Sequence, residues 1–319
     1  MLKSPPIANL QNDSLYLTNI SKPLTKEEYL NSYYKATPKF KPNEKTEYAN
    51  SNYILLGYII EQLYKKNYKT VLEEKITNPL KLKNTDVKQT NELKDNQCSS
   101  YSFINNQWKI QEETNSVVLG AAGNIVSTPF DLNTFIQQLF SYKLINQSSL
   151  EQMKTINQGF GMGLLEIPYY KRKGYGHTGG IDGFRSTLIY FPDDSVSICY
   201  LSNGEVYPKD LIVYGLLNIY YNKPYTMPVF TKFNITVDEL DKYLGLYRNA
   251  EIPLDIKITK NGISLIAQAT AQPSFDLEAF EIHKFKSEKV GVQLIFNPIK
   301  QEMTLNQRGQ NIIFKKVTP

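Results

Sequence analysis

The feature that most constrains the fold is a histidine and a threonine framed by glycines ahead of a long apolar run. Gly176-His177-Thr178-Gly179-Gly180 leads into residues 181–191, which are rich in β-branched and aromatic side chains and end at the turn Pro192-Asp193-Asp194. Flanking glycines let another backbone or a ligand approach closely. The apolar run has the composition of a buried strand. The sequence therefore predicts a strand edge that presents His177 and Thr178 to a cleft.

A second candidate segment, Tyr48-Ala49-Asn50, lies well upstream. The Tyr-x-Asn pattern also occurs at Tyr29, Tyr220 and Tyr247, so the pattern alone carries little information. Tyr48 differs from these three tyrosines in its flanking residues and in the order of the segments that follow it along the chain. These surroundings are Lys41-Pro42-Asn43-Glu44-Lys45 before it, an apolar helical pattern after it, then Asn78-Pro79-Leu80, then residues 120–128, then the His-Thr-Gly segment.

Taken together, these segments resemble the serine β-lactamase and penicillin-binding protein superfamily of bacteria, in its class C-like branch of D-alanyl-D-alanine carboxypeptidases, D-aminopeptidases and esterases. The resemblance implies acyl transfer from an amide, ester, D-amino-acid peptide or β-lactam to water. Tyr48 would take the proton of the serine nucleophile and later protonate the leaving group. The substrate-binding residues that the resemblance implies are Asn50 for the substrate amide, His177 and Thr178 for its carboxylate side, Gly179 as cleft lining, and Gly180 as a backbone donor to the oxyanion.

The nucleophile of this superfamily stands in a Ser-x-x-Lys motif well upstream of Tyr-x-Asn, whereas this chain has 47 residues before Tyr48. One such string occurs, Ser32-Tyr33-Tyr34-Lys35, but it lies inside a short predicted helix, where backbone donors cannot form an oxyanion hole. We reject it and expect an N-terminally incomplete member, through biology or a misplaced start.

A phenol with a pKa near 10 is a poor base unless a cation lowers that pKa. Without the motif's lysine, we expect Tyr48 to stay protonated and the chain to be inactive or impaired.

Net charge, apolar runs and the few cysteines and histidines bear on the partners, location and metal content expected of this protein. The formal net charge of +5 comes from lysines scattered along the chain, which argues against nucleic-acid binding. No apolar run approaches the length of a membrane span, and the first residues have no signal-peptide core, so as written the chain is expected in the cytoplasm. The resemblance implies export to the periplasm or cell envelope for complete relatives. Cys98 and Cys199 are expected as free thiols, and with His177 and His283 alone we expect no metal and no cofactor.

Turn and capping signals divide the chain into elements. Helices are expected from Thr25 to about Ala36, from Tyr53 to Lys65, from Thr70 to Ile76 with a stop at Asn78-Pro79, and from Pro129 to about Tyr142 behind a Ser127-Thr128 cap. Residues 81–118 carry no clear pattern. An antiparallel meander follows in residues 161–167, 176–191 and 196–202, and a helix over 211–221 is expected to pack on it.

A second composition begins near Thr231, with short alternating runs such as 254–258, 262–266, 292–296 and 312–314 separated by turn signals. Their spacing is typical of a small β-barrel or sandwich. Leu244-Gly245-Leu246-Tyr247 and Gln307-Arg308-Gly309 resemble the lipocalin-like domain appended to this superfamily. The expected fold is therefore α+β, with a partial α/β sandwich of β-lactamase type in residues 1–230 and a lipocalin-like β domain in residues 231–319.

Several alternatives stay open at this point. His177 could be a half-exposed strand histidine with no role, and Lys171-Arg172-Lys173 is most simply a charged hairpin tip, although it could attract an anionic cell-wall substrate. A non-catalytic protein could use the same cleft to bind a peptide or glycan. A decayed fragment would expose apolar surface and melt without cooperativity. Expected partners are a small-molecule or peptidoglycan-like peptide substrate, and the pattern leaves the oligomeric state open.

Overall fold

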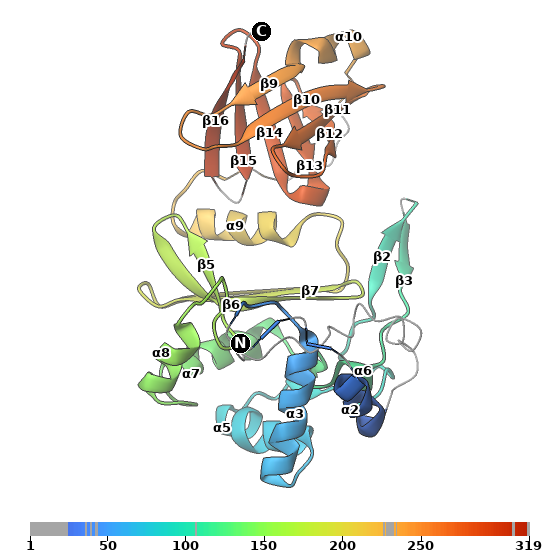
Figure 1. Ribbon diagram of the computed structural model, residues 1–319, viewed down its shortest axis with the longest axis vertical. Helices are drawn as coiled ribbons and strands as arrows, with labels where there is room; N and C mark the ends of the chain where they lie inside the picture. The colour runs from blue at the N-terminus through green and yellow to red at the C-terminus, as the bar shows by residue number, and fades with distance from the viewer. Residues whose placement is uncertain are drawn as a thin grey trace. The chain divides into compact units, whose positions relative to one another are not determined.

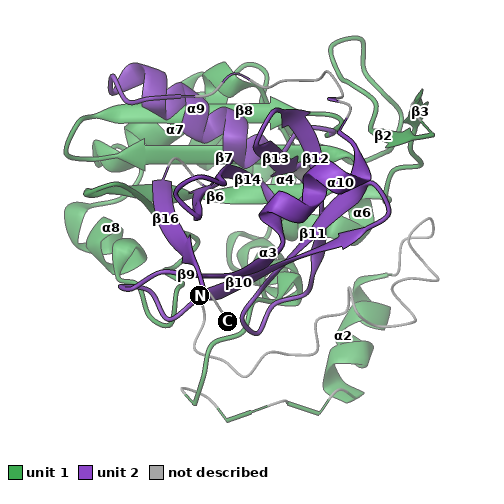
Figure 2. Cartoon of the chain, turned by 90° about the horizontal axis from the view of Figure 1, so that it is seen from above, with its two compact units in different colours: residues 1–205 green, residues 206–319 purple. Residues whose placement is uncertain are grey.

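The computed structural model describes residues 25–317 except 36, 39, 42–43, 106, 226, 228–232, 234 and 308–309. The predicted features at Ala36, Pro42, Asn43, Arg308 and Gly309 therefore lie outside the described residues. The chain divides into two compact units between Glu205 and Val206 (Figure 2). The sequence places the domain boundary at residue 230, and that boundary stays a prediction.

A four-stranded antiparallel sheet forms the centre of the first unit (Figure 1). Its strands are adjacent in chain order: β5 Leu165–Tyr169, β6 Arg172–Ile181, β7 Phe184–Phe191 and β8 Val196–Ser202. The expected meander is therefore present, but the predicted run over 176–191 is two strands rather than one. A two-residue turn at Asp182 and Gly183 reverses the chain, with Asp182 at φ +49° and Ile181 paired with Phe184. Asp-Gly is a hairpin signal because both residues tolerate such backbone angles.

The helices of this unit lie to one side of the sheet in Figure 1. They are α2 Lys26–Lys35, α3 Asn50–Tyr64, α4 Tyr68–Leu72, the π-helical turn η2 Glu73–Thr77, α5 Asn78–Leu80, α6 Ser116–Leu119, η3 Gly120–Ala122, α7 Pro129–Phe140 and α8 Gln147–Lys154. Helix α7 packs on β7 and β8, and the Phe140 ring lies 4.5 Å from that of Tyr190. Its predicted cap is confirmed, since the Thr128 hydroxyl accepts from the Asp131 N–H at 3.3 Å.

Two helix boundaries differ from the prediction. Helix α3 begins at Asn50, so Asn50 belongs to the first turn of the helix rather than to the preceding loop. The expected stop at Asn78-Pro79 is wrong, because the helical path passes through η2 and ends only after Leu80. Pro79 is tolerated there since it stands in the first turn of α5, where its missing N–H leaves no bond broken. Lys81, at φ +55°, ends the path.

Short strands fill the stretch that lacked a clear pattern. β1 Asp86–Val87 pairs with β4 Ile125–Val126, and β2 Tyr101–Ile104 forms a hairpin with β3 Gln107–Ile110. Lys171 stands in the turn between β5 and β6, as the hairpin-tip interpretation requires. The two thiols are free, with Cys98 exposed and Cys199 half-buried on β8.

The second unit contains a closed barrel of eight antiparallel strands. These are β9 Gly245–Arg248, β10 Asp255–Asn261, β11 Ser264–Ala269, β12 Phe275–Glu281, β13 Lys284–Ser287, β14 Val292–Asn297, β15 Glu302–Gln307 and β16 Gln310–Lys316, accompanied by α9 Lys209–Tyr220, α10 Val237–Leu240, η4 Asp241–Tyr243 and η5 Glu288–Val290. The predicted small β-barrel is confirmed. The helix expected over 211–221 is present as α9.

Side chains fill the barrel interior. Tyr243, Phe285 and Phe296 are nearly inaccessible, and their ring centroids lie 4.9 to 5.6 Å apart. His283 contacts this cluster through a 2.8 Å hydrogen bond between its Nδ1 and the Tyr243 hydroxyl. Sequential hairpins make most of the ladder, but β9 and β16 close it through only two residue pairs, Lys315 with Arg248 and Lys316 with Tyr247.

Helix α8 offers a matched test of helix capping. The exposed side chain of Asn146 accepts from the Ser149 N–H at 2.8 Å. Asn146→Ala removes this bond and is expected to lower the free energy of unfolding by about 1 kcal/mol, whereas Asn146→Gly should cost only about 0.3 kcal/mol. Urea denaturation of both variants checks this, and an equal loss in the two would contradict a role for the cap.

Candidate active site

A cavity of about 1110 Å³ opens within the first unit, between the β6 end of the sheet and the helical region. All six residues singled out in the sequence line it, namely Tyr48, Asn50, His177, Thr178, Gly179 and Gly180. The fold thus joins two segments far apart in the chain.

Tyr48 stands in the extended segment that leads into α3. The next residue, Ala49, occupies the N-cap position of α3 and is fully buried, and this burial fixes the backbone on which Tyr48 and Asn50 are carried. The Tyr48 ring lies 6.2 Å from the ring of His177 and 6.3 Å from that of Phe160. Tyr48 keeps 38% of its surface exposed, so a molecule in the cavity can reach it.

Burial raises the pKa of Tyr48 above its ordinary value of 10. Among the described residues no positive charge opposes this shift. The phenol is therefore protonated at neutral pH, where it can donate a hydrogen bond or a proton but is a weak base. The direction of this pKa shift is the one expected for a tyrosine that has no lysine beside it.

His177 is half-buried on β6, and its ring orientation is fixed locally. Its Nδ1 lies 2.6 Å from the carbonyl oxygen of Thr178. Because a carbonyl oxygen can only accept, Nδ1 carries the proton in this contact, and Nε2 is the ring's remaining polar atom. In the neutral ring Nε2 is then an acceptor, and protonation converts it to a donor suited to a carboxylate.

One edge of β6 is open beside these residues. β5 pairs with β6 only from Arg172 to Gly176, whereas β7 pairs with β6 as far as Ile181. Within the described residues, the segment His177–Ile181 therefore has a strand on one side alone. An extended ligand can pair with such an edge through main-chain hydrogen bonds.

Gly179 and Gly180 on this segment differ in the space that surrounds them. A Cβ at Gly179 would lie 2.4 Å from the Ser186 hydroxyl oxygen, so a larger residue there would require the Ser186 side chain to rotate. At Gly180 a Cβ would meet nothing nearer than 3.6 Å. Gly180 is exposed on the open segment of β6, where a backbone N–H can serve a ligand.

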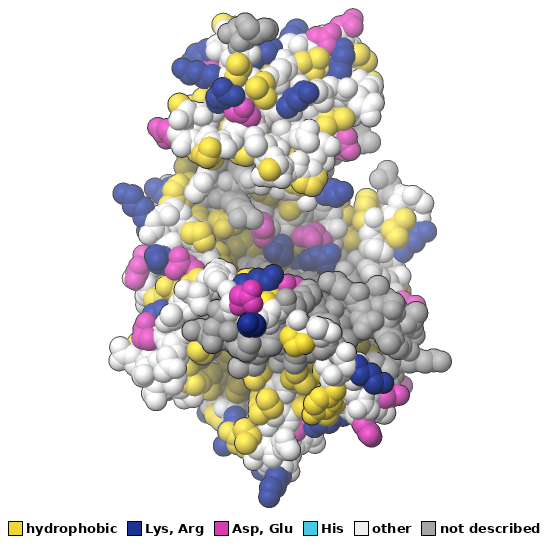
Figure 3. Space-filling model, viewed as in Figure 1, with side chains coloured by type: hydrophobic (Ala, Val, Ile, Leu, Met, Phe, Trp, Pro, Cys, Tyr) yellow, Lys and Arg dark blue, Asp and Glu magenta, His cyan; other side chains and the backbone are white. Residues whose placement is uncertain are grey.

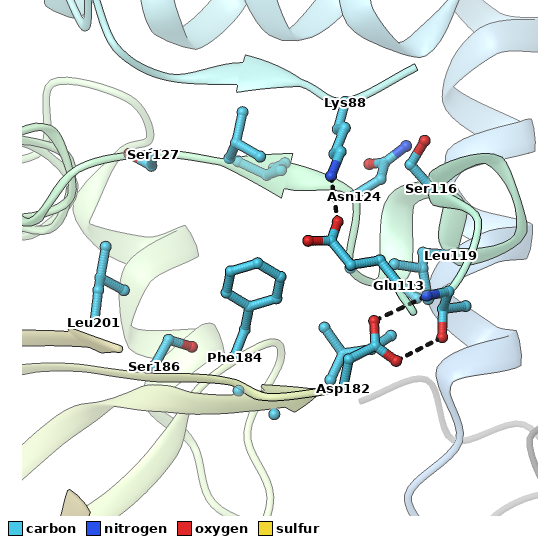
Figure 4. A pocket seen from close by; sticks show the side chains of 18 of the residues that line it. Lys88, Glu113, Ser116, Leu119, Asn124, Ser127, Asp182, Phe184, Ser186 and Leu201 are labelled. Atoms are coloured by element: carbon cyan, nitrogen blue, oxygen red, sulfur yellow. Dashed lines mark hydrogen bonds and ion pairs between the residues drawn. The ribbon is translucent and has the colours of Figure 1, made fainter. Parts of the chain in front are cut away.

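A polar network that the sequence did not indicate lies across the cavity from the sheet (Figure 4). Lys88 and Glu113 form a 2.6 Å ion pair in which each side chain is only 13% exposed. Glu113 also accepts from the Ser100 N–H at 2.9 Å, and the Ser100 hydroxyl accepts from the Gly183 N–H at 2.7 Å. Asp182 in the same turn accepts from both the backbone N–H and the hydroxyl of Thr114 at 2.9 Å.

The rejected serine lies apart from the cavity lining. The Ser32 hydroxyl donates to the Tyr29 carbonyl one turn earlier in α2, at 2.7 Å. A hydroxyl bonded within its own helix has no adjacent base to activate it. This contact supports the rejection of Ser32-Tyr33-Tyr34-Lys35 as a nucleophile motif.

The sequence profile of the family described as Beta-lactamase matches residues 4–216, about two thirds of the chain. The chain belongs to the Beta-lactamase family. Penicillin-binding protein 4* of Bacillus subtilis is 28% identical over 212 residues, which are 59% of this chain and 47% of that relative. The chain thus spans about half the length of this relative.

The chain is also similar to solved structures. A D-stereospecific amidohydrolase from Streptomyces sp. is 27% identical with a TM-score of 0.55, over 63% of each chain. The octameric penicillin-binding protein homologue from Pyrococcus abyssi has a TM-score of 0.57 over 89% of this chain and 68% of its own, at 18% identity. This last likeness concerns the fold alone.

Three further features concern the distribution of surface charge, membrane-spanning helices and metal sites. On the face seen in Figure 3, basic and acidic side chains are interspersed rather than gathered into a basic stripe. None of the helices in the described ranges combines the length and apolar character needed to cross a bilayer. Within the same residues, no three His, Cys, Asp or Glu side chains gather as a metal site would require.

The raised pKa of Tyr48 gives a direct pH prediction. A phenol whose folded pKa lies above its unfolded pKa favours folding at low and neutral pH, and this contribution is lost as the pH rises through the folded pKa. In a difference titration of phenolate absorbance, the wild type minus Tyr48→Phe is expected to show a midpoint above pH 10. A midpoint below 10 would mean that a cation acts on Tyr48.

Proposed function

We propose that the chain supplies the substrate-binding and proton-transfer groups of a Beta-lactamase-family serine hydrolase. The reaction is acyl transfer to water from an amide, an ester, a D-amino-acid peptide or a β-lactam. Tyr48 protonates the leaving group, Asn50 and His177 position the substrate, and Thr178, Gly179 and Gly180 line the cleft. The serine nucleophile of the family belongs to a Ser-x-x-Lys motif, and the one such string in this sequence, at Ser32, lies apart from the cavity lining.

One observation carries the proposal: the rings of Tyr48 and His177 lie 6.2 Å apart beside the open edge of β6. A carbonyl carbon held beside this edge has a backbone N–H on one side and a phenol proton donor on the other. Backbone donors stabilise the oxyanion of a tetrahedral intermediate, and a positioned acid assists the departure of the leaving group.

The activities named for two relatives support the substrate class. These relatives are a penicillin-binding protein and a D-stereospecific amidohydrolase. Both names fit an acyl donor with a D-configured or β-lactam centre, and we extend that class to this chain.

A second candidate, non-catalytic binding of a peptide or glycan, is favoured by the protonation state of Tyr48. Burial keeps the phenol protonated, and the Ser32 hydroxyl is bonded within its helix. A chain that relies on these groups alone retains the β6 edge and can hold a ligand without turning it over.

Penicillin G binding to the purified chain tests the proposal by calorimetry, with intact mass measured in parallel. Saturable binding is expected, weakened at least about tenfold in His177→Ala, because the side chain proposed to position the carboxylate side of the substrate is removed. Absent binding, or equal affinity in wild type, His177→Ala and Asn50→Ala, contradicts the proposed site.

The mass measurement separates the two candidates. Binding without a covalent adduct favours the binding protein or a nucleophile supplied from outside this sequence. An adduct that disappears in Ser32→Ala would restore Ser32 as the nucleophile, while an adduct on another serine would assign a new one.

A further inference from the structure

The β2–β3 hairpin carries an exposed apolar face. Tyr101 pairs with Ile110 and Phe103 with Trp108, and side chains two residues apart on a strand share a face, so these four lie together. Phe103, Trp108 and Ile110 expose 40%, 50% and 71% of their surfaces. Phe103 and Trp108 make an edge-to-face contact at 5.2 Å. Figure 3 shows hydrophobic side chains at the surface of this hairpin.

The hairpin pairs with no further strand within the described residues, yet its base is firmly held. Tyr101 donates its N–H to the Asn203 carbonyl at 2.8 Å, and the fully buried Ser100 binds Gly183. The Trp108 ring lies on Gly204, where an added Cβ would be 2.5 Å from the ring. The apolar face is thus fixed in place before any ligand arrives.

This fixed face stands at the end of the open β6 edge. Asp182 and Asn203, which flank the hairpin base, also line the cavity. Gly180 lies one residue before the end of β6 at Ile181, and Gly183, in the turn that follows, binds Ser100 at the base of the hairpin. If the scissile carbonyl sits at Gly180 and the carboxylate side at His177 and Thr178, the acyl side of an extended substrate runs toward Gly183 and the hairpin.

We propose that the β2–β3 hairpin is a distal subsite that binds an apolar side chain of a peptide substrate, three to four residues to the acyl side of the reacting bond. This inference rests on the proposed function, because it uses the direction of the substrate along β6. A peptide paired with β6 is already ordered, so an aromatic side chain added at the right distance meets Phe103, Trp108 and Ile110 at small additional entropic cost.

Trp108 is the single tryptophan of the chain, so its fluorescence reports on this subsite directly. The probes are acetylated alanine peptides ending in D-alanyl-D-alanine with a free carboxylate, with phenylalanine or serine at the fourth position to the acyl side of the bond between the two D-alanines. We expect the phenylalanine peptide to bind about tenfold more tightly and to shift Trp108 emission. Moving phenylalanine to the second position should abolish both effects.

Variants on the two faces of the hairpin provide matched controls. Phe103→Ser and Ile110→Ser should each remove most of the tenfold preference for the phenylalanine peptide. If one of these substitutions disturbs the hairpin, the other still tests the subsite. Ile104 is 48% exposed but lies on the opposite face, opposite Gln107, so Ile104→Ser should keep the preference. Circular dichroism and thermal melting confirm the fold of each variant.

Three results overturn the inference. Equal binding of the phenylalanine and serine peptides, with affinity still dependent on His177, removes the hairpin subsite but leaves the proposed function intact. A preference that survives in both Phe103→Ser and Ile110→Ser places the apolar contact elsewhere. If neither the peptides nor penicillin G bind, the proposed function and the subsite fail together.

Discussion

Gly176→Ala is expected to lower the free energy of unfolding by more than about 3 kcal/mol, or to prevent folding of the first unit. A Cβ at Gly176 would lie 1.9 Å from the carbonyl oxygen of Leu188 and 2.8 Å from its carbonyl carbon. The obstacle is the backbone of the neighbouring strand β7, which cannot rotate away as a side chain would. Relief requires β6 and β7 to separate at the centre of the sheet, next to His177.

The same substitution at Gly215 is the control. Gly215 stands in the middle of α9, where an added Cβ would meet nothing within 4 Å. Alanine is a better helix former than glycine by about 1 kcal/mol, so Gly215→Ala should stabilise the chain slightly. Urea denaturation of both variants, with m-values compared, measures the difference. A loss below about 1 kcal/mol for Gly176→Ala would mean that the sheet yields more easily than its backbone contacts imply.

Glu113→Ala is expected to cost about 3 kcal/mol, the second largest effect. Removal of this carboxylate leaves the Lys88 ammonium largely buried without its partner and deprives the Ser100 N–H of an acceptor. Lys88→Met should cost less, because it removes the cation and leaves the carboxylate with its backbone donor. The double variant should be more stable than the sum of the single losses predicts, with a coupling above about 1 kcal/mol.

The ion pair between Lys154 and Glu151 is the matched surface control. Glu151 is 54% exposed, so solvent screens this pair. Glu151→Ala should change the free energy of unfolding by less than about 0.5 kcal/mol. Similar losses for Glu113→Ala and Glu151→Ala would show that the cavity pair contributes no more than a surface pair. Thermal melting at low and high salt separates the two further, because screening acts mainly on the exposed pair.

The sequence was sufficient for elements whose signals are local. The Thr25 and Glu28 capping box begins α2, with the Glu28 N–H donating to the Thr25 hydroxyl and the Thr25 N–H to the Glu28 carboxylate. Thr128 and Pro129 begin α7 in the same local way. The glycine frame around His177 likewise identified the strand that lines the cavity, because the backbone of Leu188 leaves no room for a Cβ at Gly176.

The features that were not predicted from the sequence were missed for physical reasons. The Asp182-Gly183 turn is an Asp-Gly hairpin signal, but it was overlooked because β-branched and aromatic residues at 187–191 dominate the segment that follows it. The network through Lys88, Ser100 and Glu113 joins segments with no shared periodicity, so the tertiary fold alone brings it together. The apolar face of the β2–β3 hairpin was missed because its strands are only four residues long and Asn105 and Gln107 at the tip are polar.

The closure of the barrel has a consequence for its motions. Six residue pairs join β14 to β15 and six join β15 to β16, whereas two pairs join β16 to β9. Local opening of a fold begins where the fewest bonds must break together. The β9–β16 seam is therefore expected to open before the β14–β15 and β15–β16 ladders, and its amide protons are expected to exchange with solvent ahead of those in β14 and β15, although every strand belongs to the same closed ring.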